Sequence, residues 1–114
     1  MRTVTTLVQV VDQTQLDAAL QAKWSSMKNA LRQGNINATL PYLLTSRRAT
    51  YQSMFSALTI PFANIDQLLT NINFVRVRGV DAEYEMSVIK GGVEYSYLVL
   101  FSIDEDGVWR IKFL

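Results

Sequence analysis

The chain has 114 residues, of which 49% are hydrophobic and 18% are charged, and its formal net charge is +1. This length predicts a single domain with one hydrophobic core. The sequence lacks the clustered basic stripe expected of a nucleic-acid-binding surface, and no run of about 18 apolar residues predicts a membrane span. It contains neither cysteine nor histidine, which excludes disulfides and thiolate chemistry.

A charged content below the roughly 25% of ordinary domains favours a surface that is covered by a partner or by a second copy. Met1 and Arg2 are not followed by the apolar core of a signal peptide. If the full protein is exported, we expect the signal to lie upstream, in a longer chain.

Residues 3–11 alternate β-branched and polar side chains without a helical period, which predicts a strand. We interpret this strand as a leader or as the end of a preceding domain, with the main domain over residues 12–114. A helix is then predicted from a cap at Thr14, with Asp17 three residues later, to a stop near Gly34. Its apolar stripe consists of Leu16, Leu20, Trp24, Met27 and Leu31.

Shorter helices are predicted next. Asn35 caps the first of them, and Thr45 or Ser46 caps the next. Pro61 ends that helix, because the residue before a proline disfavours the helical conformation. A last short helix is expected over residues 65–69.

Residues 72–114 predict a four-stranded antiparallel meander with one apolar inner face. Gly91 and Gly92 between alternating runs are typical of a two-residue hairpin turn, which pairs Lys90 with Val93. The pairs then expected on the inner face are Val88 with Tyr95, Met86 with Tyr97, Tyr84 with Val99 and Ala82 with Phe101.

The other two turns agree with this inner face. A two-residue turn at Gly79 and Val80 pairs Val77 with Ala82 and Val75 with Tyr84. A three-residue turn with Gly107 in the left-handed conformation keeps the last strand in phase, whereas a slip of one residue would reverse every side chain. In that phase Trp109, Ile111 and Phe113 lie beside Ile103, Phe101 and Val99.

Helices followed by a meander make an α+β domain, with the N-terminal helices packed on one face of a curved sheet. A set of core and turn residues recurs along these elements: Trp24, Met27, Ala30, Leu31, Gly34, Asn35, Ile36, Leu40, Ser46, Arg47, Tyr51 and the strand Gly107-Val108-Trp109-Arg110-Ile111. This set resembles the nuclear transport factor two-like superfamily over residues 12–114.

The resemblance implies a cone of helices against a curved sheet. The superfamily includes ketosteroid isomerase, scytalone dehydratase, limonene epoxide hydrolase and polyketide cyclases, together with many non-catalytic binding domains, so the fold does not choose a function. The closest likeness is to uncharacterised bacterial domains that follow immunoglobulin-like domains in larger surface or exported proteins. It implies a cell-surface or exported location as part of a larger chain.

Acid–base catalysis in such a cone requires an inward ionisable group, and members resembling ketosteroid isomerase use an inward aspartate with a tyrosine. The predicted register turns the strand carboxylates outward and leaves Asp12, Asp17 and Asp66, which lie near predicted helix starts where dipoles favour them. We therefore predict no catalytic residue. We also predict no cofactor and no metal site, because the turn that begins at Asp104 lacks the ligand spacing of a calcium loop.

The predicted ligand pocket inside the cone comprises Trp24, Arg48, Tyr51, Tyr84, Tyr95, Tyr97 and Trp109. The aromatic side chains among them can equally fill the core. Arg48 lies in the first turn of a predicted helix, where the helix dipole repels cations, so it either pairs within the protein or binds an anion.

Leu98 and Leu100 interrupt the polar pattern of the outer sheet face, which predicts an interface there with a second copy or a neighbouring domain. The preferred hypothesis is a non-enzymatic binding or interaction domain of a larger bacterial protein. The alternative is a small isomerase, hydrolase or cyclase-like enzyme with an apolar substrate in the cone.

Overall fold

The computed structural model describes the backbone of residues 2–58 and 61–114, and the side chains of residues 13–58 and 61–114. The first helix, α1, spans Arg2–Arg32. The strand predicted over residues 3–11 and the cap predicted at Thr14 are therefore wrong, because one helix runs through both. Strand propensity reflects packing on a sheet more than an intrinsic backbone preference. The domain boundary at Asp12, whose side chain lies outside the described residues, stays a prediction.

The end of α1 and the next cap are confirmed. Gly34 adopts φ +73°, as a glycine after a helix C-terminus often does, and the Asn35 side chain accepts a hydrogen bond from the Ala38 N–H at 3.2 Å. The helix after Asn35 is a 3₁₀ helix, and it contains Pro41, which cannot donate a backbone hydrogen bond. The short helices are η1 (Ile36–Tyr42), η2 (Thr45–Arg47), α2 (Arg48–Ser56) and η3 (Phe62–Gln67).

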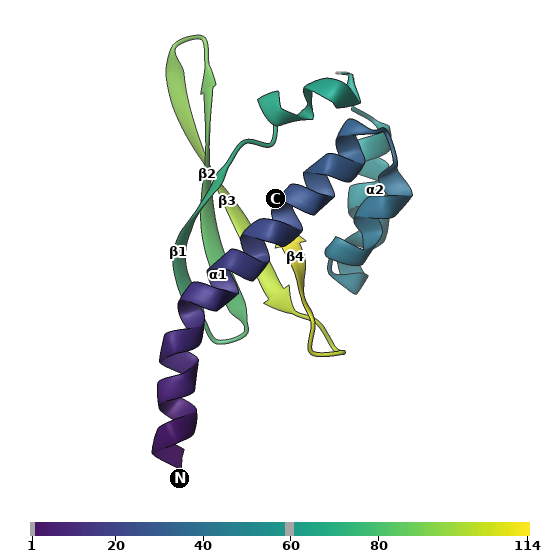
Figure 1. The fold of residues 1–114 in the computed structure, drawn as a ribbon. Coiled ribbons are helices and arrows are strands. Elements are labelled where there is room, and N and C mark those ends of the chain that lie inside the picture. The colour runs from purple at the N-terminus through teal and green to yellow at the C-terminus, as the bar shows by residue number, and fades with distance from the viewer. Residues whose placement is uncertain (1, 59–60) are drawn as a thin grey trace.

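The second half of the chain forms the predicted four-stranded antiparallel meander, in the order β1-β2-β3-β4. The domain is therefore of the α+β class, with α1 crossing one face of the sheet (Figure 1). The strands are β1 (Ile72–Arg78), β2 (Asp81–Lys90), β3 (Val93–Ile103) and β4 (Trp109–Phe113).

The register between β2 and β3 is confirmed in full. Lys90 pairs with Val93, and the four inner-face pairs are those that the sequence predicts. Gly91 and Gly92 have φ values of +58° and +79°, the left-handed conformation that a tight hairpin turn requires at both central positions.

The register between β1 and β2 is confirmed near the turn and wrong beyond it. Val77 pairs with Ala82, but a shift between Phe74 and Arg76 makes Phe74 the partner of Tyr84 in place of Val75. The extra residue of a β-bulge reverses the side chains that follow it. The Phe74 ring consequently packs edge-on against the Tyr84 ring, with centroids 5.6 Å apart. Val75 is exposed.

A second shift lies between β3 and β4. Ile103 pairs with Trp109 and Phe101 with Ile111, as predicted, but Phe113 pairs with Leu100 and not with Val99. Phe113 is exposed, so the prediction that it lies on the inner face is wrong. The bulge places its ring beside Leu100, which belongs to the outer face.

The hydrophobic core lies between α1 and the inner face of the sheet. The rings of Tyr84 and Phe101 meet edge-on at its centre, with centroids 5.4 Å apart. Two side chains of α1 also bond to the segment that enters the sheet: Trp24 Nε1 donates to the Thr70 carbonyl at 2.8 Å, and Gln21 Nε2 donates to the Ile72 carbonyl at 2.9 Å. These bonds fix the position of the helix along the sheet.

The β2–β3 hairpin is longer than its neighbours. Pairing with β1 ends at Met86, and pairing with β4 covers only residues 100–103 of β3. The tip of the hairpin consequently projects past α1 as a two-stranded ribbon (Figure 1).

Candidate functional site

Three residues of the predicted pocket fill the core. Trp24, Tyr51 and Tyr84 are all buried. Trp24 Nε1 already donates to a backbone carbonyl, and Tyr51 Oη accepts a hydrogen bond from the Leu114 N–H at 3.0 Å. Their polar atoms are therefore used within the fold, in the manner of core aromatic residues.

The other tyrosines of the predicted pocket lie apart from these three. Tyr95 and Tyr97 share the inner face with Val88 and Met86, but they lie on the projecting hairpin and are 45% and 39% exposed. The Lys90 ammonium lies 5.6 Å from the centroid of the Tyr97 ring, within the range of a cation–π contact.

Trp109 and Arg48 lie elsewhere again. Trp109 is half-buried in β4. Arg48 Nε donates to the carbonyls of Leu40 and Leu43, at 2.9 Å and 3.2 Å. It stabilises the carbonyl end of η1, so of the two predicted roles, pairing within the protein or binding an anion, the structure shows pairing within the protein, with backbone carbonyls.

An aspartate–tyrosine pair crosses from α1 to the sheet. Tyr84 Oη donates to Asp17 Oδ1 at 2.6 Å, and Gln21 Nε2 lies 3.4 Å from the same oxygen. Burial raises the pKa of Tyr84, and the hydrogen bond to Asp17 raises it further. Asp17 lies inside α1, so the prediction that it lies near a helix start is wrong.

This pair has the composition of the acid–base sites implied by the resemblance. Tyr84, however, has no exposed surface, and its hydroxyl proton is engaged by Asp17. A sequence signal could have placed Asp17 toward the sheet. Asp17 and Gln21 are one helical turn apart, and both lie beside Leu20 of the apolar stripe.

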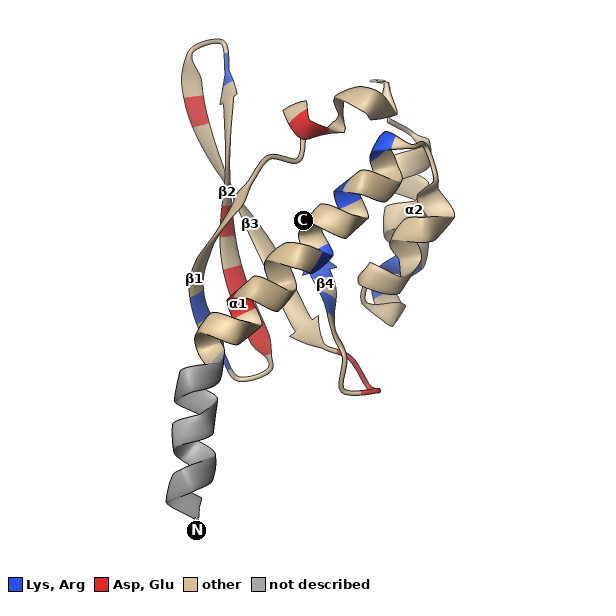
Figure 2. Ribbon diagram, in the orientation of Figure 1, with Lys and Arg blue, Asp and Glu red and all other residues tan. Residues whose placement is uncertain are grey.

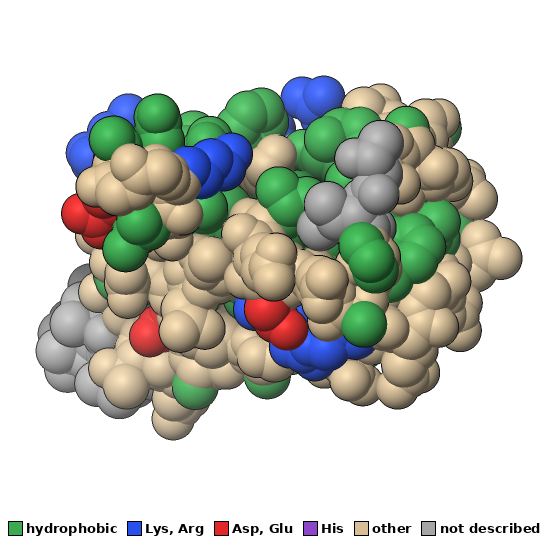
Figure 3. Space-filling view, turned by 90° about the horizontal axis from the view of Figure 1, so that it is seen from above, with side chains coloured by type: hydrophobic (Ala, Val, Ile, Leu, Met, Phe, Trp, Pro, Cys, Tyr) green, Lys and Arg blue, Asp and Glu red, His purple; other side chains and the backbone are tan. Residues whose placement is uncertain are grey.

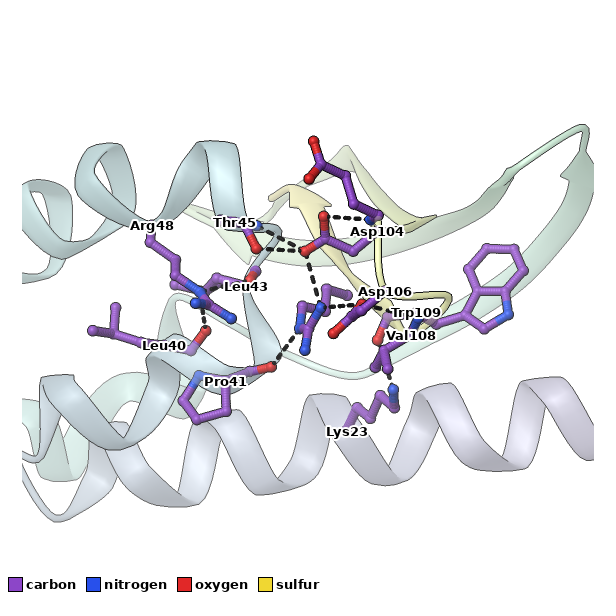
Figure 4. Close-up of polar contacts among 12 residues, drawn as sticks. Lys23, Leu40, Pro41, Leu43, Thr45, Arg48, Asp104, Asp106, Val108 and Trp109 are labelled. Atoms are coloured by element: carbon purple, nitrogen blue, oxygen red, sulfur yellow. Dashed lines mark hydrogen bonds and ion pairs between the residues drawn. The ribbon is translucent and has the colours of Figure 1, made fainter.

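A charged cluster joins the β3–β4 turn to the helices (Figure 4). Asp104 Oδ2 accepts hydrogen bonds from the Thr45 N–H at 3.0 Å and from Thr45 Oγ1 at 2.7 Å. Arg110 Nη1 lies 3.0 Å from Asp104 and 2.7 Å from Asp106, and its Nε donates to the Pro41 carbonyl at 3.1 Å. The bonds from Thr45, followed by those from Glu105 N–H and Arg110, hold the pKa of Asp104 well below its usual range.

Lys23 reaches the same cluster from α1. Its Nζ donates to the Trp109 carbonyl at 2.6 Å. Burial lowers the pKa of Lys23, the positive charge of Arg110 lowers it further, and Asp106 opposes both effects. The cluster thus holds two carboxylates and two cations, and its contacts tie together α1, η1, η2 and β4.

Other ion pairs lie at η3 and on the outer sheet face. On η3, Asp66 contacts Lys28 at 2.8 Å and Arg32 at 2.7 Å, and these bonds, Arg32 foremost, keep the pKa of Asp66 below its usual range. On the outer sheet face Glu83 contacts Arg76 at 3.1 Å. Acidic residues follow β2, and basic residues lie on α1 and β4 (Figure 2).

Apolar side chains remain exposed along β3. Leu98 is 47% exposed on the outer face opposite Glu85, and Leu100 next to it pairs with the exposed Phe113. Hydrophobic side chains also gather at the projecting hairpin, seen from above in Figure 3. We define the β3 surface as the apolar side chains on the two faces of the free part of β3 and beside it: Tyr95 and Tyr97 on the inner face, and Leu98, Leu100 and Phe113 of β4 on the outer face.

Among the side chains that the structure describes, no group of three or more acidic residues is arranged to hold a metal ion. Within the described helices, none combines the length and hydropathy that a membrane crossing requires. A shallow depression on α2 is lined by Gln52, Ser53, Ser56 and Ala57, and it contains no ionisable side chain.

Compared with protein-family models, with curated protein sequences and with solved structures, the chain has no match in any of the three.

Proposed function

We propose that this chain is a non-enzymatic interaction domain that binds a protein partner through the β3 surface. The observation that carries the proposal is the run of apolar side chains on the outer sheet face, where Leu98 and Leu100 continue into Phe113. Contiguous exposed apolar surface is typical of interaction sites, and aromatic residues are enriched at them.

The ionisable groups support the same proposal. Asp17, Asp104 and Arg110 use their hydrogen bonds within the fold, and the pairs they form connect α1 and the short helices to the sheet. The alternative, an isomerase, hydrolase or cyclase-like enzyme, rests on the Asp17–Tyr84 pair. A general acid has to reach its substrate, and the complete burial of Tyr84 favours a structural role for this pair.

The arrangement of helices on a meander is consistent with the nuclear transport factor two-like superfamily, and we propose membership of its bacterial branch. In a larger exported or cell-surface protein, either a second copy or a neighbouring domain would cover the outer face at Leu98 and Leu100.

Site-specific photo-crosslinking tests the proposal directly. A benzophenone amino acid at Leu98, introduced in the cells that make the protein, should yield a discrete crosslinked species. The matched control carries the same probe at Gln52, which is exposed on α2 outside the β3 surface, and should yield none. Equal crosslinking at both positions, or none at Leu98, would contradict the proposal.

A further inference from the structure

The projecting hairpin leaves two stretches of open edge, residues 87–90 of β2 and residues 93–99 of β3, and the β3 stretch is the longer. Residues 93–99 of β3 pair with β2 on one side, whereas the pairing with β4 on the other side begins only at Leu100. None of the described strands pairs with residues 93–99 on that side. An open edge presents unpaired N–H and C=O groups to any strand that approaches.

The edge strands β1 and β4 carry the devices that prevent such pairing. β1 has a bulge at Val75 and presents Arg76 and Arg78. β4 is short and presents Arg110 and Lys112. Bulges, short strands and charged side chains are common protections of an edge. Residues 93–99 have one charged side chain, Glu94, no proline and no register shift.

The sequence of this edge is complementary to itself. An antiparallel pairing of two copies, centred on Ser96, places Tyr95 of each copy opposite Tyr97 of the other. The same register places Val93 opposite Val99 and Glu94 opposite Leu98, so no charge faces its own copy. Opposed aromatic pairs stabilise antiparallel strands, and opposed like charges destabilise them.

The end of β4 sets one end of the open stretch. The N–H of Leu114 donates to Tyr51 Oη, and β4 ends at Phe113 beside Leu100. The shared ladder would be about 23 Å long at about 3.3 Å per residue.

We propose that residues 93–99 of β3 pair in antiparallel fashion with the same residues of a second copy, about a two-fold axis at Ser96. The sheets of the two copies join into one, and Tyr95 and Tyr97 form the contact on the inner face. This inference rests on the proposed function, because both assign binding to the exposed side of β3. Main-chain hydrogen bonds supply the affinity of such a contact, and alternate side chains supply the specificity.

A cysteine at the axis tests the pairing. The chain contains no cysteine, so Ser96→Cys introduces a single thiol that faces its own copy. Opposed residues in an antiparallel ladder have Cα atoms about 4.5–5.5 Å apart, which suits a disulfide. Under mild oxidation we expect a disulfide-linked dimer of Ser96→Cys and none of Ser53→Cys, an exposed control on α2. Equal linkage of both variants, or no linkage at Ser96, would overturn the inference.

Charged substitutions at Tyr95 and Tyr97 test the register, with the dimer Kd measured by sedimentation equilibrium. Tyr95→Glu with Tyr97→Glu opposes like charges twice and should raise the dimer Kd by about tenfold or more. Tyr95→Glu with Tyr97→Lys opposes unlike charges at the same positions and should retain the dimer. The control pair Val75→Glu with Val80→Glu, exposed near the other edge, should also retain it.

Three results would overturn the inference: a wild-type chain that stays monomeric at its highest soluble concentration, equal dissociation of the two tyrosine double variants, or dissociation of the control pair. The proposed function can fail separately. A crosslink from Leu98 to a different protein, found together with a monomeric wild type, would overturn the β3 pairing and leave the proposed function intact.

Discussion

Tyr84, in the centre of the sheet, donates its hydroxyl proton to the Asp17 carboxylate of α1 over 2.6 Å. The bond joins the second strand of the sheet to a helix residue 67 positions earlier in the chain. Tyr84 also packs edge-on against Phe74 and Phe101. The pair therefore contributes to the packing of α1 on the sheet, which is the central contact of the fold.

Tyr84→Phe removes this hydrogen bond and keeps the ring. We expect the free energy of unfolding to fall by about 1–2 kcal/mol, because the Asp17 carboxylate loses a buried donor. Urea denaturation followed by circular dichroism measures the change. Tyr97→Phe is the matched control and should change the unfolding free energy by less than about 0.5 kcal/mol, since its hydroxyl is at the surface. Equal effects of the two substitutions would contradict the assigned role.

Asp104→Asn should weaken the protein at neutral pH more than at acidic pH. The lowered pKa of Asp104 means that its carboxylate stabilises the folded state above the ordinary carboxyl pKa of about 3.9. This stabilisation is lost as the pH falls toward the lower folded-state value. The difference in urea midpoint between wild type and variant should therefore shrink from pH 7 to pH 3.

The control for this experiment is Glu105→Gln. Glu105 is the next residue in the turn, is exposed, and forms no ion pair within the described residues. Glu105→Gln should therefore show the same pH dependence of the urea midpoint as wild type. A difference between Asp104→Asn and wild type that stays constant across the pH range would contradict the role of the ionised carboxylate.

Phe101→Ala and Leu98→Ser should have different effects on stability, because the two residues lie on opposite faces of β3. Phe101 is fully buried, so its truncation should cost about 3–5 kcal/mol of unfolding free energy. Leu98 is exposed, and Leu98→Ser should cost less than about 0.5 kcal/mol and should raise solubility by reducing the apolar surface. Chemical denaturation and the concentration at which each variant precipitates measure both effects. A large loss of stability in Leu98→Ser would show that Leu98 belongs to the core.

Gly107→Ala tests the three-residue turn before β4. Gly107 has φ +81°, and no atom lies within 4 Å of the position that a Cβ would take. The cost is therefore conformational, about 1 kcal/mol for an alanine in this region. Thermal unfolding measures it. A variant as stable as wild type would contradict the left-handed conformation at this position.

The strand pairings near the turns could be predicted because turn chemistry and alternation agree there. Gly91-Gly92 fixed the whole β2–β3 register. The two bulges could not be predicted from alternation alone. At the first, Phe74 takes the inner position expected for Val75; at the second, Phe113 leaves the inner face and pairs with Leu100. Both errors lie at the strand end away from the turn, where one extra residue costs little.

The residues of the predicted pocket could be placed on the correct elements but not at the correct depth. Tyr84 and Tyr95 are on the same inner face by register, yet Tyr84 is buried and Tyr95 is exposed. The difference arises because the hairpin projects past α1, and the reach of a helix across a sheet is a tertiary property. The need of Arg48 for a partner could be predicted from its position in a helix. The partners themselves, the backbone carbonyls of Leu40 and Leu43, could not.

Hydroxyl-radical footprinting of the tyrosines most directly tests the claim that the β3 surface is a binding surface. We expect Tyr95 and Tyr97 to be oxidised rapidly in the dilute purified chain and slowly in the cells that make the protein. Tyr84 and Tyr51 should be oxidised slowly in both, since they are buried in the core. Equal, rapid oxidation of Tyr95 and Tyr97 in both settings would contradict the claim, because nothing would then cover the β3 surface.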